Sequence, residues 1–297
     1  MVETRRRLIG IALMIGAVAC FACLDTSAKW LNRTMDPLQT ASIRYVGSFL
    51  LVAAFFNPWT KTLLLRTHSL WRQCVRAGCL VVATLCAFSA LRFLPLTEFT
   101  SITFSSPLVV ALIARPLLGE WLGLKRLIAV LIGFAGVLVV TRPGSHGVHP
   151  AVALAVITAC ANAFYSVATR LVAGHDSPET TLVYTGLVGS LLMVPVAPFV
   201  WTTPTSAPVW LAMVGVAAFG ALGHWLLILA HKRAPASIVA PFFYAQLLWA
   251  TLLGWLLFGE VPDRWTLIGG AIVMGSGLYL LSRERAKHKR PSADVSA

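Results

Sequence analysis

The chain has 297 residues, of which 58% are hydrophobic and only 12% are charged, and its mean hydropathy is +0.79. This composition excludes most soluble enzyme folds, because one bilayer crossing takes about 20 apolar residues and the chain has room for roughly ten crossings. The net charge of +13 would suit a nucleic-acid partner, but the basic residues form short clusters between apolar runs. We therefore interpret them as topology signals and contacts with membrane lipids, and expect no nucleic-acid partner.

Ten apolar runs, bounded by charged residues or by Pro and Gly, predict ten membrane-spanning helices. The runs are continuous and rich in Leu, Ala and Val, so they favour helices over the alternating strands of a β-barrel. We expect an all-α polytopic membrane protein with helices at about 8–31, 38–56, 74–93, 97–115, 124–141, 150–171, 179–200, 209–231, 236–258 and 265–282.

The distribution of Lys and Arg predicts the orientation of these helices. With both termini in the cytoplasm, 18 of the basic residues fall on the inner side and 5 on the outer side. This bias is typical of the positive-inside rule. The sequence therefore predicts a multi-pass protein of the inner (plasma) membrane with both termini cytoplasmic, and it leaves only Arg44 well inside a helix.

An internal repeat relates the two halves of the chain. A shift of 140 residues, without a gap, places Pro95 on Pro235 and the Gly-Glu pair at 119–120 on the pair at 259–260. Leucine matches are expected by chance in apolar helices. A matching proline and a matching Gly-Glu pair in one register are informative. The repeat covers almost the whole chain, with five expected helices in each copy.

The copies divide the chain into a first module at 1–143 and a second module at 144–282, followed by a basic cytoplasmic tail at 283–297. Because five is odd, the second module enters the membrane from the side opposite to the first. Such inverted repeats serve alternating access in transporters, where two similar halves open in turn to either side of a midplane site.

Ionisable side chains at membrane depth are functional candidates, because each is costly unless paired or hydrated. Asp25 and Lys29 are four residues apart on one helical face and are expected to pair with each other. Arg44 lies within the second helix, Glu98 opens the fourth, and His224 is midway along the eighth. We expect these five residues to line a substrate-binding cavity.

Each of these residues also has a structural interpretation. Asp25 with Lys29 would form a pair that reaches the outer surface, and Glu98 would satisfy the free N–H groups at a helix start. His224 would be an interhelical hydrogen-bonding residue. The Gly-Glu pairs near 120 and 260 are interpreted as structural turns whose glutamates pair with a nearby Arg or Lys.

Aromatic residues add a second candidate feature. Phe243 and Tyr244 lie between Pro241 and Gln246, where the expected ninth helix is least uniformly apolar. They are candidates for the wall of a site that binds a substrate ring, and helix packing is the alternative role.

Several other classes of protein are disfavoured by what the sequence lacks. It has no His-Glu-x-x-His, no Gly-x-Ser-x-Gly and no P-loop, so we expect neither an enzyme nor an ATP-driven pump, and no cofactor. His146 and His149 have no further ligands nearby, so no metal site is expected. The remaining alternatives are an intramembrane enzyme with an unrecognised site and a scaffold or receptor that transports nothing.

Several segments of both modules carry a resemblance to a known family. Residues 90–107 (ALRFLPLTEFTSITFSSP), with 118–120 (LGE) and 133–138 (GFAGVL), resemble the EamA-type module of the drug/metabolite transporter superfamily. In the second module 234–236 (APA), 258–260 (FGE) and 275–277 (GSG) are similar. The resemblance implies ten helices in two inverted modules, cytoplasmic termini and a central cavity.

The same resemblance implies secondary transport of a small molecule. We expect an exporter of a small amphoteric metabolite, such as an amino acid or an amino-acid-derived compound, including an opine-type metallophore. The alternative is an importer of a cofactor-like solute such as riboflavin or S-adenosylmethionine. The Leu-Thr-Glu variant at 96–98 resembles the subgroup of the family that includes riboflavin and S-adenosylmethionine carriers. Coupling to a proton or ion gradient and the oligomeric state are left open.

Overall fold

The structure is a computed structural model, which describes residues 2–57, 62–118, 124–142, 149–173, 175–234 and 239–288. Across these ranges the chain is helical, without strands. The elements are α1 (Val2–Leu31), α2 (Pro37–Phe56), η1 (Thr62–Leu65), α3 (Leu70–Leu91), α4 (Leu96–Thr103), α5 (Ser106–Leu118), α6 (Leu124–Thr141), α7 (Ala151–Ala173), α8 (Pro178–Met193), α9 (Ala197–Val200), α10 (Ala207–Arg233), η2 (Ala240–Tyr244), α12 (Ala245–Phe258) and α13 (Arg264–His288).

The described part of the chain contains six helices that are long and apolar enough to cross a bilayer, and shorter apolar helices accompany them. The all-α, multi-pass character expected from composition is therefore confirmed. The six spans are Thr4–Leu31, Pro37–Phe56, Leu70–Leu91, Leu96–Ile113, Ala151–Thr169 and Ala207–Arg233, and the shorter helices are Leu127–Thr141 and Phe242–Phe258.

Two helix starts are encoded locally in the same way. α2 begins at Pro37 after Asp36, and α8 begins at Pro178 after Ser177. In both cases the side chain of the capping residue accepts a hydrogen bond from an N–H of the first turn, at 2.8 Å for Asp36 and 3.1 Å for Ser177. Proline suits the first helical position because its φ is fixed and its missing N–H would have no partner there.

Two expected helices are interrupted, and both breaks fall at the same point of the repeat. The helix expected at 97–115 ends at Thr103 and resumes at Ser106, because the ring of Pro107 is incompatible with the carbonyl of residue 103 in a continuous helix. The helix expected at 236–258 instead has a 3-10 turn over residues 240–244, around Pro241, before α12 begins. The shift of 140 residues places Phe104, in the first break, on Tyr244, the last residue of the 3-10 turn.

Two further boundaries differ from the sequence expectation. The helix expected at 179–200 ends at Met193, and only the short α9 follows it, because Pro195 and Pro198 interrupt the backbone hydrogen bonds. At the other end of the chain, α13 continues through His288 instead of ending at 282. The sequence Arg-Glu-Arg-Ala-Lys at 283–287 consists of good helix formers, so the first part of the expected tail is helical.

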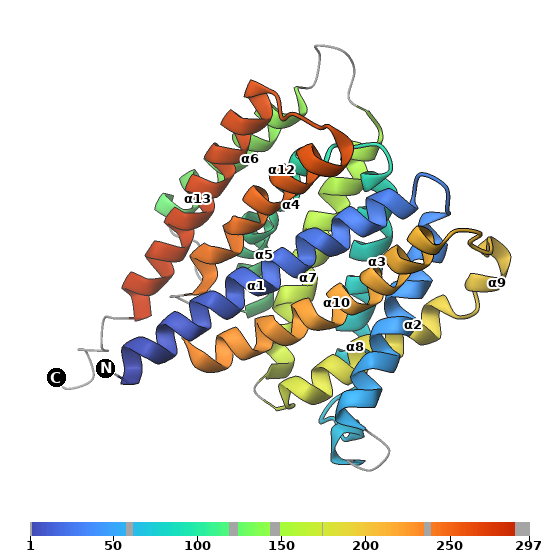
Figure 1. Cartoon of the computed structure of the whole chain (residues 1–297). Helices are drawn as coiled ribbons and strands as arrows, with labels where there is room; N and C mark the ends of the chain where they lie inside the picture. Colours follow the sequence, from blue (N-terminus) through green and yellow to red (C-terminus); the bar gives the residue numbers. More distant parts are fainter. Residues whose placement is uncertain are drawn as a thin grey trace.

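Helices of the two sequence halves pack against one another in pairs (Figure 1). α1 lies along α10 and α3 lies along α7, while α2 packs on α8 and α6 packs on α13. α4 packs on α12 in the same manner. The start of α1 and the end of α13 lie at the same end of the bundle.

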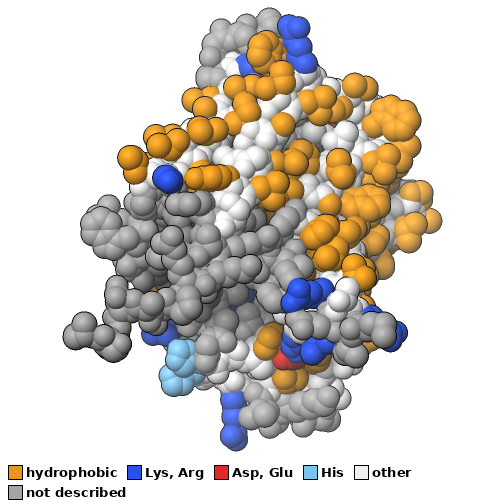
Figure 2. Space-filling model, turned by 90° about the vertical axis from the view of Figure 1, so that its left-hand side faces the viewer, with side chains coloured by type: hydrophobic (Ala, Val, Ile, Leu, Met, Phe, Trp, Pro, Cys, Tyr) orange, Lys and Arg blue, Asp and Glu red, His pale blue; other side chains and the backbone are white. Residues whose placement is uncertain are grey.

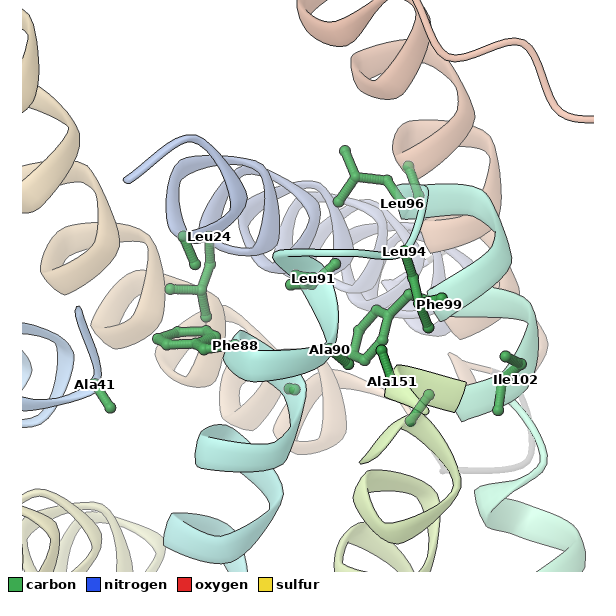
Figure 3. Packing of buried hydrophobic residues seen from close by; sticks show 14 of the residues in the cluster. Leu24, Ala41, Phe88, Ala90, Leu91, Leu94, Leu96, Phe99, Ile102 and Ala151 are labelled. Carbon is green, nitrogen blue, oxygen red and sulfur yellow. The ribbon is translucent and has the colours of Figure 1, made fainter. Parts of the chain in front are cut away.

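The largest buried cluster joins α1, α2, α3, α4 and α7 (Figure 3). Phe88 of α3 and Phe99 of α4 are almost wholly buried within it, and the break between α3 and α4 lies in the same cluster. Burial of these side chains fixes the position of the α3–α4 turn, which contributes to the site described below.

The outer surface of the bundle is apolar, as a lipid environment requires. Exposed large side chains include Leu131 and Ile132 of α6, Leu191 of α8, Val214 of α10 and Leu248 of α12. Figure 2 shows one face on which hydrophobic side chains form a broad area, while most Lys and Arg side chains lie towards its two ends. This distribution fits helices whose middles contact lipid and whose ends contact headgroups.

Candidate functional site

Arg44 lies in a buried cluster that joins α2 and α3. Its exposed fraction is 8%, and its guanidinium donates to the hydroxyls of Thr84 and, at 3.5 Å, Tyr45. The Tyr45 and Thr84 hydroxyls are 2.8 Å apart, and the guanidinium lies over the rings of Tyr45 at 5.0 Å and Phe88 at 5.9 Å. All of these partners are neutral, so the guanidinium of Arg44 has no directly bonded counter-ion among the described residues.

Next to this cluster is a cavity of about 30 Å³ between α2, α3, α8 and α10. That volume holds about two water molecules. It is far below the few hundred Å³ of a metabolite site, so the helices must separate to admit a solute. The lining residues are Arg44, Tyr45, Ser48, Val52, Leu80, Leu182, Thr185, Gly186, Gly220, Ala221 and His224.

Two glycines allow the close packing around this cavity. A Cβ on Gly220 would lie 3.1 Å from the Ser48 hydroxyl and 3.7 Å from Nε of Arg44. A Cβ on Gly189 would lie 2.1 Å from the Tyr45 ring. Larger residues at these positions would displace the polar side chains that form the wall, so the glycines of α8 and α10 set its shape.

The structure brings Arg44, His224 and Asp25 into one neighbourhood. His224 lines the cavity and contacts the edge of the Phe21 ring at a centroid distance of 5.1 Å. The charge of Arg44 acts on both His224 and the Asp25 carboxylate. Asp25 itself accepts a hydrogen bond from Gln246 of α12 at 3.2 Å. Helices α1, α2, α10 and α12 therefore all contribute polar groups here.

The expected pairing of Asp25 with Lys29 is wrong. Lys29 instead forms an ion pair with Glu260 at 2.7 Å and donates to the carbonyl of Leu94. The second carboxylate oxygen of Glu260 accepts from the N–H of Leu96 at 2.9 Å. Residue spacing along α1 could not identify Glu260 as the partner of Lys29, because Glu260 follows α12 and is distant in sequence. The interpretation of Glu260 as a structural turn residue paired with a lysine is confirmed.

We name this arrangement of Lys29, Glu260, Leu94 and Leu96 the Lys29 link. It ties the end of α1 and the end of α12 to the turn between α3 and α4. Gly259 ends α12 with a positive φ of 67°, which L-residues rarely adopt, and so directs Glu260 back towards α4. The ammonium of Lys29 is occupied by these contacts.

Glu98 belongs to the same end of the bundle as the Lys29 link. It is half-buried in the first turn of α4, where a carboxylate is favourable for the helix dipole. The charges that act on it include those of Lys29, Arg142 and Asp263. The structure therefore places Glu98 with Lys29, away from the cluster around Arg44.

Phe243 and Tyr244 lie in the 3-10 turn η2. The Tyr244 ring meets the edge of Phe104 at 5.1 Å and 88°, and Phe243 is 6.0 Å from Phe104. The hydroxyl of Tyr244 is buried and has no hydrogen-bond partner among the described residues. A shift of 140 residues relates Phe104 to Tyr244, so equivalent positions of the two halves contact one another.

Arg76 is a buried charge that the sequence pattern did not indicate. It was counted with the cytoplasmic charges because it lies near the start of α3, but it is wholly buried. Its guanidinium donates to Gln73 of the same helix and to Thr181 and Thr185 of α8, at 2.6–3.1 Å. The signal that could have found it is Gln73, a polar neighbour three residues away on the same helical face.

Gln73 continues this network to Asp176, between α7 and α8. The carboxylate of Asp176 accepts from Gln73 at 2.9 Å, from the N–H of His68 at 2.8 Å and from Thr67 at 2.5 Å. Burial raises the pKa of Asp176, but these hydrogen bonds outweigh it and hold the pKa below its usual value. We name Gln73, Arg76, Asp176, Thr181 and Thr185 the Arg76 ladder.

The Lys29 link and the Arg76 ladder lie near opposite ends of α3. Gln73 and Arg76 are near its first residue, Leu70, whereas Leu94 follows its last residue, Leu91. A helix rises about 1.5 Å per residue, so 22 residues separate the two ends by about 33 Å, roughly the thickness of a bilayer core. The cavity lies between these two polar connections.

The described residues contain no group of three or more His, Cys, Asp or Glu side chains that could hold a metal ion. His149 instead accepts from the N–H of Ala151 at 3.1 Å and lies 5.1 Å from the Phe93 ring. His146 and Glu120 lie outside the described residues.

Comparison with known proteins identifies the family. The model of the EamA-like transporter family matches twice, over residues 8–142 and 149–283. The chain is 28% identical to a riboflavin transporter of Rhizobium johnstonii, over 98% of this chain and 97% of that protein. It is 29% identical to a riboflavin transporter of Vibrio cholerae, over 95% of each. With an S-adenosylmethionine uptake transporter of Rickettsia bellii it shares 24% identity, over 93% and 94%.

A solved crystal structure matches with a TM-score of 0.64 and 20% identity, over 97% of this chain and 99% of that one, and shows a shared fold. The expected membership of the EamA-type drug/metabolite transporters is confirmed by the family matches. The chain therefore belongs to the EamA-like transporter family and is a multi-pass membrane transporter of small solutes.

Proposed function

We propose that this protein imports a cofactor-like solute, of the riboflavin or S-adenosylmethionine type, across the bacterial inner membrane. The observation that carries the proposal is the small cavity lined by Arg44, Tyr45 and His224, which lies between the Lys29 link and the Arg76 ladder. The riboflavin and S-adenosylmethionine transporters compared above match over nearly their whole lengths, which favours this reading.

The exporter expected from the sequence receives no support from these relatives, two of which are named for riboflavin and one for S-adenosylmethionine uptake. An aromatic and polar cavity wall suits either type of solute. Tyr45 and His224 offer rings for stacking, while Arg44 and Asp25 offer both signs of charge.

The proposed mechanism is alternating access between two inverted modules, 1–143 and 144–282. Three features support it. The helices pair between the halves, the helix breaks at 104 and 244 coincide in the repeat, and Phe104 and Tyr244 contact each other as two positions related by a two-fold axis would. Discontinuous helices beside a midplane site are typical of such transporters.

In this mechanism the two polar connections act as alternating closures. Opening the Lys29 link would separate α1 and α12 from the α3–α4 turn and admit solute from outside. Opening the Arg76 ladder would separate α3 from α8 and release it to the cytoplasm. With both termini cytoplasmic, as the charge distribution predicts, the Arg76 ladder is the inner closure.

Counterflow in proteoliposomes tests the proposal. Vesicles loaded with unlabelled riboflavin or S-adenosylmethionine should accumulate the same labelled compound from outside, and protein-free vesicles should not. Exchange of amino acids with no exchange of either cofactor-like solute would reject the import proposal and restore the exporter. A pH or Na⁺ gradient imposed on the same vesicles reports whether uptake is coupled to an ion.

A further inference from the structure

The Arg76 ladder extends from the cavity to the surface. Thr185 lines the cavity and accepts from Nη2 of Arg76 at 2.6 Å. The carbonyl of Thr181, one turn earlier in α8, accepts from the same nitrogen at 2.7 Å. Gln73 accepts from Nε of Arg76 at 3.1 Å and passes the network on to Asp176. Polar groups thus form a continuous path between α3 and α8.

Arg76 has no charged hydrogen-bond partner along this path. Its acceptors are an amide, a backbone carbonyl and a hydroxyl. Its exposed fraction is 0%, and Nη1 is buried without any hydrogen-bond partner among the described residues. The Tyr165 ring lies 5.3 Å from the guanidinium carbon. A buried guanidinium with an unused donor is costly unless another acceptor uses that donor during function.

The two guanidinium groups near the cavity make their direct hydrogen bonds to neutral groups. Arg44 and Arg76 both act on His224, which lines the cavity. Their described hydrogen-bond partners are all neutral, and the carboxylate on which Arg44 acts is Asp25. The carboxylate of the Arg76 ladder, Asp176, reaches Arg76 only through Gln73, so neither guanidinium has a directly bonded counter-ion among the described residues. Burial of a charge without a direct counter-ion is unfavourable, and an anion bound beside the two guanidinium groups would compensate it.

Resting on the proposed transport function, we propose that the solute carries an anionic oxygen group, a carboxylate or a phosphate, and that Arg76 binds this group together with Arg44. Arg76 contacts Thr185 of the cavity wall and has the unused donor Nη1, whereas Arg44 lines the cavity itself. A planar guanidinium matches the geometry of a carboxylate or a phosphate. Its hydrogen bonds to either anion are strongest where little water competes for them. The neutral remainder of the solute would lie against Tyr45 and His224.

Two matched pairs of compounds test this proposal with the purified full-length protein. Riboflavin and riboflavin 5′-phosphate differ by a phosphate, and S-adenosylmethionine and its decarboxylated form differ by a carboxylate. Calorimetric titration should show that the anionic member of at least one pair binds about tenfold tighter or more. The pair that shows the difference identifies the anion as phosphate or carboxylate.

The variant Arg76→Gln should reduce that preference to less than about twofold. Arg76→Lys keeps the charge without the fork and should retain an intermediate preference. Arg72→Gln is the matched control, because Arg72 lies one turn earlier in α3 and is exposed. It removes the same formal charge and should leave the preference unchanged.

Equal binding of both members of each pair by the wild type, or no binding of either anionic compound, overturns the proposal. So does an Arg76→Gln protein with a lowered melting temperature and an unchanged preference, since that result assigns Arg76 a bracing role alone. If Arg76→Gln does not fold, the preference of Arg76→Lys decides the question. Anion binding without any counterflow would instead reject the import proposal and leave this site standing.

Discussion

Two buried charges in this protein have partners on segments that are distant in sequence. Lys29 pairs with Glu260 across the bundle, and Arg76 reaches Thr181 and Thr185 of α8. Arg44 differs because its direct partners are hydroxyls. Its charge remains available to a solute, which makes substitutions at this residue informative.

Arg44→Ala should nearly abolish transport, and Arg44→Lys should reduce it, because a lysine keeps the charge but not the planar fork that reaches the Thr84 and Tyr45 hydroxyls. Counterflow of the transported solute measures the effect. Variants that insert and melt like the wild type but bind solute with unchanged affinity would remove Arg44 from the site.

Glu260→Gln should destabilise the protein by about 2–3 kcal/mol, because it leaves the ammonium of Lys29 buried without a counter-ion. The expected value is below that of a fully buried pair, since 20% of the Glu260 side chain is exposed. Denaturant unfolding in detergent measures it. Glu179→Gln is the control: its partner Lys232 is 45% exposed, so the loss should stay below about 1 kcal/mol. Equal losses in both variants would contradict this account of the Lys29 link.

At the scale of the elements, small residues let helices of the two halves approach closely. A Cβ on Gly136 of α6 would lie 2.9 Å from the carbonyl of Gly269, and a Cβ on Gly269 of α13 would lie 2.6 Å from the carbonyl of Gly136. Backbone atoms cannot rotate away as side chains do. The α6–α13 contact therefore depends on glycine at both positions, as is common where helices pack in lipid.

Gly269→Ala should lower stability by about 1–3 kcal/mol by forcing α6 and α13 apart. Gly275, two turns later in α13, has nothing within 4 Å of an added Cβ. Gly275→Ala should therefore raise stability by about 0.5–1 kcal/mol through helix propensity alone. The melting temperature should fall for Gly269→Ala and rise for Gly275→Ala. If both melting temperatures move in the same direction, close packing does not explain the need for glycine at 269.

At the scale of the whole molecule, the proposed solute path has a polar connection near each end and a small cavity between them. In the proposed mechanism, solute entry requires one connection to break while the other holds. Hydrogen bonds and ion pairs suit this role better than an apolar seam, because water can replace each lost partner when a side opens.

Reporter fusions test the topology on which the direction of transport depends. Fusions at 143–149 and 201–208 should report the outside, and those at 57–72 and at the C-terminus should report the cytoplasm, because this arrangement places most Lys and Arg inside. One consistent reversal among the four positions would reject the ten-helix topology, and with it the assignment of the Arg76 ladder as the inner closure.

The sequence by itself determined the class of this protein. Continuous apolar runs specify membrane helices because the bilayer leaves a backbone few other ways to satisfy its hydrogen bonds, and Asp36-Pro37 and Ser177-Pro178 encode helix starts within a few residues. Repeat matches and the residues at 90–107 identified the family for the same reason: each is a local pattern that can be read along the chain.

Only the tertiary structure decided which charges meet. Lys29 was expected beside Asp25 because four residues span one helical turn, yet it pairs with Glu260, and Arg76 was counted as a surface charge although it is wholly buried. Helical spacing reports which side chains share a face, but the partner of that face is set by packing between segments distant in sequence. The breaks at 104 and 244 meet for the same reason, since no local pattern specifies which helix lies opposite another.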